Sequence, residues 1–229
     1  MTSASAPACR SVRIDGLFAG GLSLLGPEAT RTGIVKIARD RIAATAAGIS
    51  GDVQADRRVH GGPDKAVHHF PAEHYPALAA AFPAASGLLA PGALGENVST
   101  HGWTEQNVAI GDVHAVGAVR LQVSQPRSPC WKIDARLDQP GVARWIAAQG
   151  IAGWYCRVLA PGELDIGAEL VLIDRVTPAV SVREFWQLVQ QHRPDPDRLR
   201  QLAALPGLAG DWKRRLDERA GWREGAADS

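Results

Sequence analysis

From residue 12 to about residue 175, the chain alternates short apolar runs with glycine, proline and aspartate. The runs are rich in β-branched side chains and have the length of strands. This pattern predicts a mainly β architecture, either a barrel or a sandwich with crossing connections. Strands are expected within 11–20, 33–38, 40–45, 107–116, 119–125, 155–162 and 168–173.

Two stretches inside this region have helical features instead. PAEHYPALAAAF, at 71–82, is rich in alanine and is opened by Pro71, with Pro76 expected either to kink the helix or to start a second turn. PGVARWIAAQG, at 140–150, ends in Gly150, and glycine readily adopts the left-handed conformation that closes a helix. A few helices are therefore expected among the strands.

The pattern changes to helical periodicity after residue 178. Ser181 and Glu184 have the spacing of a capping box, and the apolar residues that follow fall on one helical face. Asp195 and Pro196 form the cap and first residue of a second helix. A third helix is expected at about 208–219, where leucine and tryptophan recur at helical spacing.

These patterns predict two parts of unequal size. A β domain occupies 12–175, and a small three-helix unit occupies 178–222. Residues 1–11 and 223–229 are small and polar, so they are expected to be flexible tails.

The composition is that of an ordinary globular protein. Among 229 residues, 45% are hydrophobic and 21% are charged, enough for one sizeable core or one core with a small appended domain. The 25 basic and 24 acidic residues give a net charge of +1, so no nucleic-acid partner is expected and any anion site must be local.

The chain is expected to be soluble and cytoplasmic, with no membrane contact. It contains no secretory signal and no run of about 18 apolar residues. The three cysteines are odd in number and far apart, which argues against a disulfide framework and for a reducing compartment. They are Cys9, Cys130 and Cys156.

The stretch SQPRSPCWKID places Cys130 between Arg127 and Lys132, on a loop stiffened by two prolines. A nearby positive charge stabilises a thiolate, the form of cysteine that attacks electrophiles or binds metals. The alternative is a small buried hydrophobe, which is the usual role of a free cysteine. That role suffices for Cys156, which lies in an apolar strand pattern.

A second stretch, ADRRVHGGPDKAVHHF at 55–70, surrounds a Gly-Gly-Pro turn with basic side chains. Glycine lets the backbone approach closely, so amides and cations can converge on one anion. The alternative is a polar hairpin with solvated charges. Zinc is disfavoured, because the histidines lack HExxH or CxxC spacing. The basic side chains are Arg57, Arg58, His60, Lys65, His68 and His69.

A third stretch, GALGENVSTHGW at 92–103, has glycines on both sides of Glu96 and Asn97. A sharp turn here would leave the Asn97 side chain free to bond a ligand, and a plain turn is the alternative. The chain contains neither GxxxxGK[ST] nor GxGxxG, which disfavours a nucleotide-binding domain of either kind. The GxSxG elbow of serine hydrolases is also missing.

Taken together, the motifs HGGPDKAV, GALGENVS and SQPRSPCWK resemble the MOSC domain, named for the C-terminal domain of molybdenum cofactor sulfurases. The YiiM-like subgroup is the most similar, and the resemblance covers about 12–175. It implies a MOSC-type β-barrel with a few helices, followed by a small C-terminal three-helix unit. It also implies that the molybdenum cofactor is bound with Cys130 as the molybdenum ligand.

The resemblance gives the other candidate residues their expected roles. Cys130 and His60 would be catalytic, with His60 supplying a proton. Cations would meet the phosphate end of the cofactor, although which of them do so stays open. The expected cofactor-binding residues are Arg57, Lys65, His68, Asn97, Ser124, Arg127 and Lys132.

Relatives of this kind reduce N-hydroxylated compounds such as amidoximes and hydroxylaminopurines. The resemblance therefore implies a small N-hydroxylated substrate. The two electrons would come from a separate reductase, because the chain has no flavin or iron–sulfur motif. Neither the membrane anchor of eukaryotic relatives nor a pyridoxal phosphate domain is expected, so a cysteine desulfurase is excluded. A monomer or a homodimer is expected.

Two other functions stay open from the sequence. The first is a non-catalytic carrier that holds the cofactor, or sulfur on Cys130, for another protein. The second is a hydrolase with Cys130 as nucleophile and His60 or His68 as base. The density of cations suits an anionic cofactor better than an acyl substrate, which disfavours the hydrolase.

Overall fold

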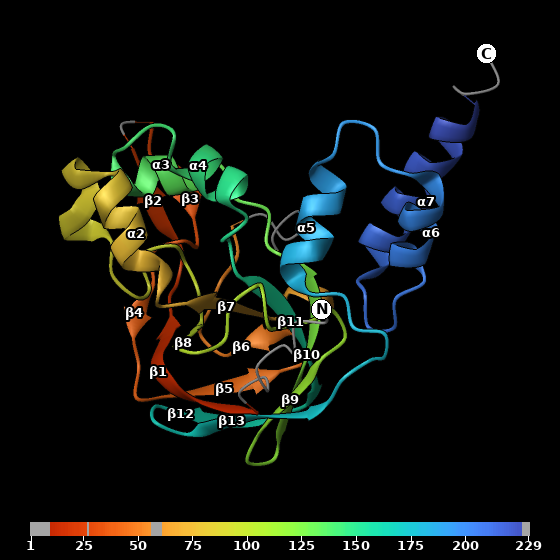
Figure 1. The fold of residues 1–229 in the computed structure, drawn as a ribbon. Coiled ribbons are helices and arrows are strands. Elements are labelled where there is room, and N and C mark those ends of the chain that lie inside the picture. Colours follow the sequence, from red (N-terminus) through yellow and green to blue (C-terminus); the bar gives the residue numbers. More distant parts are fainter. Residues whose placement is uncertain (1–9, 27, 56–60, 226–229) are drawn as a thin grey trace, which may run out of the picture.

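A computed structural model describes residues 10–26, 28–55 and 61–225, and seven of its strands close into a barrel (Figure 1). Neighbours around the barrel follow the order β13, β9, β10, β11, β7, β8, β1, and pairing of β1 with β13 closes it. The predicted mainly β barrel is thus confirmed. Its strands are β1 (Ser11–Ala19), β7 (Val67–Pro71), β8 (Val98–Thr100), β9 (Val113–Val116), β10 (Val119–Pro126), β11 (Trp154–Ala160) and β13 (Glu169–Asp174).

Six further strands lie outside the closed barrel. β2 and β3 form a hairpin, β5 lies between β6 and β12 in a small sheet, and β4 pairs with the end of β1. Their bounds are β2 (Ser23–Leu25), β3 (Thr30–Thr32), β4 (Ile37–Ala38), β5 (Arg41–Thr45), β6 (Gly48–Ile49) and β12 (Gly162–Asp165).

The strand predicted at 33–38 is wrong except for its last two residues. Gly33 packs directly on the backbone of Val53, and a Cβ added to Gly33 would lie 1.9 Å from the carbonyl oxygen of Val53. This close approach bends residues 33–36 into a loop that leads into β4.

β7 lies in the stretch whose residue types allowed a polar hairpin. All five of its residues are buried, and it pairs in parallel with β8 and antiparallel with β11. His68 and His69 are therefore interior residues rather than solvated charges. A short 3-10 helix, η1 (Pro63–Lys65), precedes the strand and holds Lys65 at the rim of the barrel.

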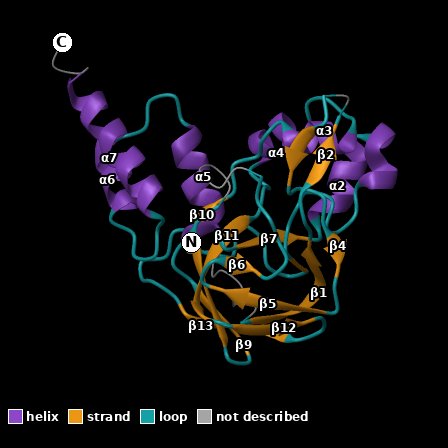
Figure 2. Ribbon diagram, turned by 180° about the vertical axis from the view of Figure 1, so that it is seen from behind, coloured by secondary structure: helices purple, strands orange, loops and turns teal. Residues whose placement is uncertain are grey.

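A first group of helices covers one end of the barrel and has an apolar core of its own (Figures 1 and 2). The predicted helix at 71–82 begins only at His74, because Pro71 ends β7, and Pro76 lies in the first turn, where no backbone donor is required. Gly150, at φ 64°, ends α4 as predicted. These elements are α2 (His74–Ala81), η2 (Pro83–Leu88), α3 (Lys132–Leu137) and α4 (Val142–Gln149).

Three helices follow the barrel: α5 (Val182–Gln190), α6 (Pro196–Ala203) and α7 (Gly210–Gly225). Two of the predicted caps are confirmed. Ser181 Oγ accepts from the backbone N of Glu184 at 3.0 Å, and Asp195 Oδ1 accepts from the backbone N of Asp197 at 2.9 Å. α7 extends three residues beyond the predicted end of the unit at residue 222.

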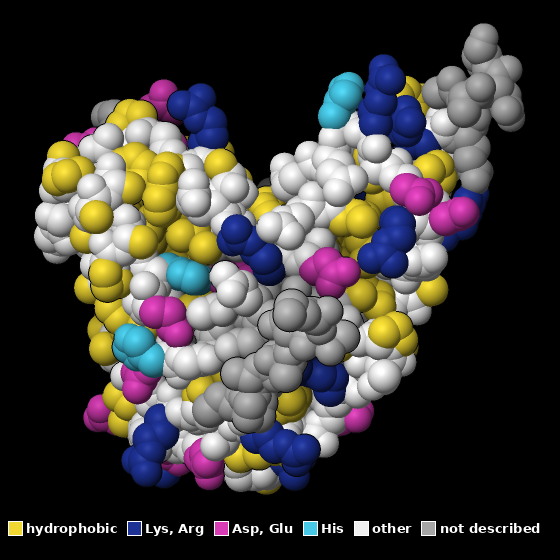
Figure 3. Space-filling view, in the orientation of Figure 1, with side chains coloured by type: hydrophobic (Ala, Val, Ile, Leu, Met, Phe, Trp, Pro, Cys, Tyr) yellow, Lys and Arg dark blue, Asp and Glu magenta, His cyan; other side chains and the backbone are white. Residues whose placement is uncertain are grey.

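The core of the barrel continues into these three helices. One buried apolar cluster contains Ile14 of β1 and Leu121 of β10 together with Phe185, Leu199 and Leu216 of the three helices. The molecular surface is hollowed between the two helix groups, where a groove is lined by residues of α4 and α5 (Figure 3). The division of the chain into two domains stays a prediction. Within the described ranges, no helix combines the length and the apolar character needed to cross a membrane.

The interior of the barrel contains neutral histidines. His69 is 1% exposed, and its Nε2 lies 2.8 Å from Thr100 Oγ1. Burial lowers its pKa from 6.5 to about 3. Burial also lowers the pKa of His114 and His68 well below the ordinary value. The unfolded chain therefore binds protons below pH 6.5 that the folded chain does not.

We expect stability to fall as the pH is lowered from 7 to 5. For His69 alone, the free energy of unfolding should drop by about 2 kcal/mol, since each proton contributes about 1.4 kcal/mol per pH unit. Urea denaturation at both pH values measures the drop. His69→Gln should reduce it by about that amount, whereas replacement of the exposed His192 by Gln should keep all of it. An unchanged drop in His69→Gln would contradict the assignment.

Candidate functional site

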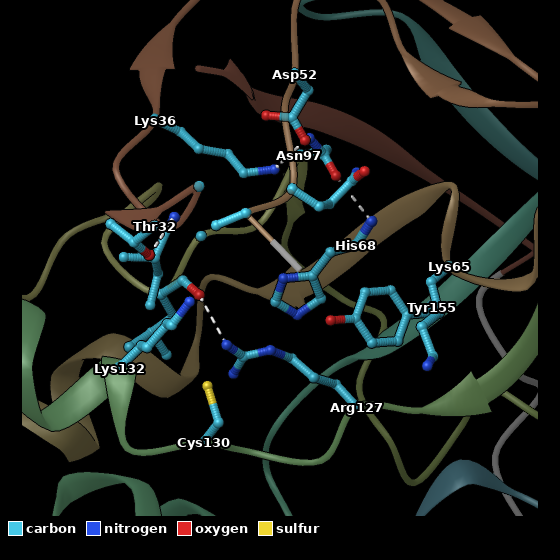
Figure 4. A pocket seen from close by; sticks show the side chains of 16 residues that line it. Thr32, Lys36, Asp52, Lys65, His68, Asn97, Arg127, Cys130, Lys132 and Tyr155 are labelled. Carbon is cyan, nitrogen blue, oxygen red and sulfur yellow. Dashed lines mark hydrogen bonds and ion pairs between the residues drawn. The ribbon is translucent and has the colours of Figure 1, made fainter. Parts of the chain in front are cut away.

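A cavity with about 590 Å³ of empty space opens where the barrel meets the first helix group (Figure 4). Its described lining comes from the end of β3 and the loop after it, the segments 52–55 and 94–97, η1, β7, β11 and the loop between β10 and α3. Segments that are far apart in the sequence thus form one site.

The cavity lining is strongly cationic. Its described residues include four basic side chains, from Lys36, Lys65, Arg127 and Lys132, against the single carboxylate of Asp52. Since the whole chain carries a net charge of only +1, positive charge is concentrated here. The lining has the local excess of cations that an anionic ligand requires.

Cys130 lies on the loop that leaves the barrel at the end of β10. The backbone N of Arg127 donates to the carbonyl of Gly153 at 3.1 Å, which fixes the start of the loop, and Ile133 N donates to the Cys130 carbonyl at 3.0 Å at the start of α3. The thiol is half-buried, and Figure 4 shows its sulfur pointing toward the guanidinium of Arg127. Cys156 is fully buried, and burial raises the pKa of its thiol far above the ordinary value.

Arg127 has a buried nitrogen without a partner. Its side chain is only 6% exposed, and Nη2 donates to the carbonyl of Leu94 at 3.1 Å. Nη1 is fully buried and has no hydrogen-bond partner among the residues that the structure describes. Buried donors are normally paired, so this nitrogen is suited to an acceptor brought by a ligand.

Glu96 braces the loop that holds Arg127. Its carboxylate is completely buried and accepts from the hydroxyl of Tyr75 and the backbone N of Gly92, both at 2.5 Å, and from Leu94 N at 3.2 Å. Burial raises the pKa of Glu96, while these donors act in the opposite direction. Because Leu94 in turn accepts from Arg127, Glu96 helps to fix the guanidinium.

Lys36 and Asp52 form a buried ion pair in the wall of the cavity. Lys36 Nζ lies 2.7 Å from Asp52 Oδ2, and the two side chains are 6% and 4% exposed. Burial lowers the pKa of Lys36, and the adjacent carboxylate acts to raise it. The second carboxylate oxygen accepts from Gly20 N at 3.0 Å. Lys36 therefore has a resident counterion.

The amide of Asn97 is not free, which corrects the expectation drawn from its turn. Both of its Nδ2 hydrogens have acceptors, the carbonyl of Phe18 and Asp52 Oδ2, each at 3.1 Å. Its Oδ1 accepts from the backbone N of His68 at 3.0 Å. Asn97 lines the cavity and is 2% exposed, but its donors already serve the fold.

His68 lines the cavity as a neutral ring. Burial lowers its pKa well below 6.5, and the charges of Arg127 and Lys36 add to this effect. Its Nε2 lies 3.3 Å from the carbonyl of Ala152. His68 therefore adds no positive charge at neutral pH. Tyr155 lies beside it, with ring centroids 5.3 Å apart, and burial raises the pKa of the phenol, which keeps its proton.

The remaining predicted residues have different positions. Lys65 and Lys132 line the cavity, and Lys132 Nζ donates to the carbonyl of Arg31 at 3.1 Å. Ser124 is fully buried outside the lining, and its hydroxyl faces the carbonyls of Asp64 and Tyr155, at 2.5 and 2.9 Å. This geometry does not favour the predicted pterin contact of Ser124. The predictions for Arg57, Arg58 and His60 lie outside the described residues.

The sequence profile of the MOSC domain matches residues 56–171 of the chain. Protein YiiM of Escherichia coli is 40% identical over 194 residues, which are 84% of this chain and 86% of that protein. The chain belongs to the MOSC domain family. The crystal structure of YiiM from Escherichia coli has a TM-score of 0.77 at 33% identity, with 93% of this chain and 94% of that chain covered.

A further relative has a functional name. A protein of Gibberella moniliformis named Reductase is 35% identical over 163 residues. These residues are 71% of this chain but only 29% of that protein. This MOSC chain therefore matches a minor part of the longer relative.

Lys36, Asp52 and Tyr155 are among the lining residues of this MOSC cavity that were missed from the sequence. Lys36 lies in a run that was predicted to be a strand, and Asp52 lies in a turn that carries no motif. Tyr155 could have been found, because the core residues Trp154 and Cys156 flank it in β11, and strand alternation then places Tyr155 on the opposite face.

Single replacements in the Lys36–Asp52 pair should each leave one buried charge uncompensated. We expect Lys36→Met and Asp52→Asn each to lower the free energy of unfolding by about 3 kcal/mol. The double variant should lose less than the sum, since neither charge is then left alone. Urea denaturation measures all three. Arg41→Gln, which breaks an exposed ion pair with Asp165, is the control and should leave the free energy of unfolding nearly unchanged. If the losses of the two single variants simply add up in the double variant, the two charges are not coupled.

Proposed function

We propose that this chain binds the molybdenum cofactor in the cavity and reduces N-hydroxylated compounds, such as amidoximes or hydroxylaminopurines, with electrons from a separate reductase. The observation that carries the proposal is the half-buried thiol of Cys130 beside Nη1 of Arg127, a buried donor with no partner in the part of the chain that the structure describes. Membership of the MOSC family and the relative named Reductase support an oxidoreductase.

The donor set fits the cofactor in two respects. Thiolate is a soft ligand suited to molybdenum, and guanidinium and ammonium groups suit phosphate. Among the described residues, no three His, Cys, Asp or Glu side chains gather as a metal site. In this proposal Cys130 would offer the metal its sulfur, and the pterin dithiolene would supply further sulfur ligands.

Each lining residue has a proposed task. Arg127 and Lys132 bind the anionic part of the cofactor on the side of Cys130, and Lys65 contributes charge from η1. Tyr155 lines the cavity and keeps its phenolic proton, and in this proposal its hydroxyl donates a hydrogen bond to the bound ligand. The predicted proton donor His60 stays a prediction. Lys36 is held by Asp52 and shapes the wall.

When bound, the cofactor supplies a two-electron redox centre at which an N–O bond is reduced to N–H with release of water. The chain positions the substrate against this centre and orients donors toward the departing oxygen. Two protons and two electrons balance the reaction, and the electrons come from the reductase.

Loss of the thiol should remove the metal. We expect Cys130→Ser, purified from cells that synthesise the cofactor, to contain about a tenth or less of the molybdenum of the wild type, since hydroxyl is a poor ligand for a soft metal. Elemental analysis of the purified proteins measures this. Cys156→Ser is the matched control for a buried thiol and should keep its molybdenum. Equal metal in wild type and Cys130→Ser would disprove the ligand assignment.

Turnover then separates the enzyme from the carrier. Molybdenum-containing wild type should reduce hydroxylaminopurine to aminopurine with a chemical reductant, and Cys130→Ser should not. Full molybdenum content without turnover, with any electron donor or any N-hydroxylated substrate, would favour the alternative function of a cofactor or sulfur carrier.

Arg127 should matter for retention of the cofactor. We expect Arg127→Met to weaken retention about tenfold, because a buried charge-assisted hydrogen bond is lost. The molybdenum remaining after dialysis at increasing salt measures this loss. Arg120→Met is the control, since the guanidinium of Arg120 bonds the carbonyl of Gly117 at the β9–β10 hairpin. Equal retention in all three proteins would place the anion elsewhere.

A further inference from the structure

The first turn of α7 meets the loop that carries Lys65. Asp64 is the residue before Lys65, and each of its two carboxylate oxygens has a hydrogen-bonding partner near this contact. Oδ1 lies 2.9 Å from Arg157 Nε and 2.8 Å from Arg157 Nη2, and Oδ2 accepts from the backbone N of Gly210 at 3.3 Å. Gly210 is the first residue of α7, where the helix dipole favours a negative charge.

Ser124 strengthens the same junction from the barrel. Its hydroxyl faces the carbonyl of Asp64 at 2.5 Å, and its own carbonyl accepts from Ala209 N at 2.9 Å. The pairing of β10 with β11 shifts register at this position, which frees Ser124 from regular ladder bonds. η1, β10 and the start of α7 are therefore joined through two side chains.

The connector between α6 and α7 also packs closely against the barrel. Gly207 has φ +79°, and a Cβ added there would lie 2.7 Å from the Cα of Gly111. A Cβ added to Gly111 would in turn lie 2.5 Å from the carbonyl oxygen of Pro206. Two glycines thus let the connector rest on the backbone of the barrel.

α7 brings charged side chains toward Lys65. Burial lowers the pKa of Lys65. Asp211 of the first turn acts to raise this pKa, Arg215 of the second turn acts to lower it, and the neighbouring Asp64 also acts to raise it. The pKa of Asp211 is lowered mainly by Arg214, with a contribution from Lys65. The electrostatic environment of this cavity lysine thus depends on the place of α7.

We propose that Asp64 is a positioning residue that clamps the Lys65 loop to the first turn of α7, so that the C-terminal helices set the affinity of the cavity for anions. This inference rests on the proposed function only in taking the ligand to be anionic. The helices are in this respect part of the binding site and not only a cover for the barrel.

A double-mutant cycle tests whether Asp64 acts through Lys65. The probe is inorganic pyrophosphate, titrated by calorimetry into the cofactor-free full-length chain. We expect Asp64→Asn to weaken its binding about fivefold. In the Lys65→Met background, the same replacement should have almost no further effect, because the group that it positions is gone. Asp165→Asn, which removes a carboxylate paired with Arg41 on the small sheet, should bind like the wild type.

A second variant leaves the carboxylate in place. Gly207→Ala should push the connector off the barrel and weaken pyrophosphate binding in a wild-type background but not in the Lys65→Met background. Circular dichroism melts identify a variant that fails to fold. Equal losses in both backgrounds, or unchanged affinity in Asp64→Asn and Gly207→Ala, would overturn the positioning role.

The outcomes also separate this inference from the proposed function. A wild type that retains molybdenum but shows no coupling between Asp64 and Lys65 would overturn the positioning role alone. A coupled pair in a protein that never takes up molybdenum would overturn the proposed function alone. A wild type that does not bind pyrophosphate would overturn the assignment of the cavity as a binding site for anions, and both proposals with it.

Discussion

The buried amide of Asn97 holds together chain segments that are otherwise distant. Its side chain bonds the backbone of Phe18 and His68 and the carboxylate of Asp52. Its backbone accepts from Phe18 N and donates to the carbonyl of His68, both at 2.8 Å. β1, β7 and the segment at 52–55 are thus fixed around one residue. These bonds within the protein hold the floor of the cavity in place.

Three further segments complete the site around the floor of the cavity. The 94–97 turn, braced by Glu96, holds the guanidinium of Arg127 through the carbonyl of Leu94. The loop after β10 presents Cys130, and η1 presents Lys65 beside the start of α7. Cys130 and the basic residues of the cavity therefore lie on different segments of the chain. Each of these segments is fixed by its own contacts.

The sequence was sufficient for features that depend on local rules. Short β-branched runs predicted most strands of the barrel, and the caps at Ser181 and Asp195 marked two helix starts correctly. The cluster of Cys130, Arg127 and Lys132 was found because its members are neighbours in the chain. These features need only periodicity, capping chemistry and adjacency.

Features that depend on tertiary contacts were not accessible in the same way. β7 is buried along its whole length, so it shows no alternation of polar and apolar residues. The turn around Asn97 was recognised, yet the partners that occupy its amide lie 79 and 45 residues away. Likewise, His68 and His69 were expected to be cationic, because the sequence does not reveal that both side chains are buried. The motifs contain residues that the fold gathers in one cavity, but only the fold decides which of these groups are charged and which are already bonded.

The concentration of cations in the cavity has a consequence for how ligands arrive. Without its four basic residues and one carboxylate, the chain has 21 basic and 23 acidic residues, a net charge of −2. The molecule as a whole therefore offers no long-range attraction to an anion. At physiological ionic strength, the field of the cavity fades over about 8 Å. An anionic ligand would therefore meet the attraction of these cations only close to the mouth of the cavity, where contact selects it.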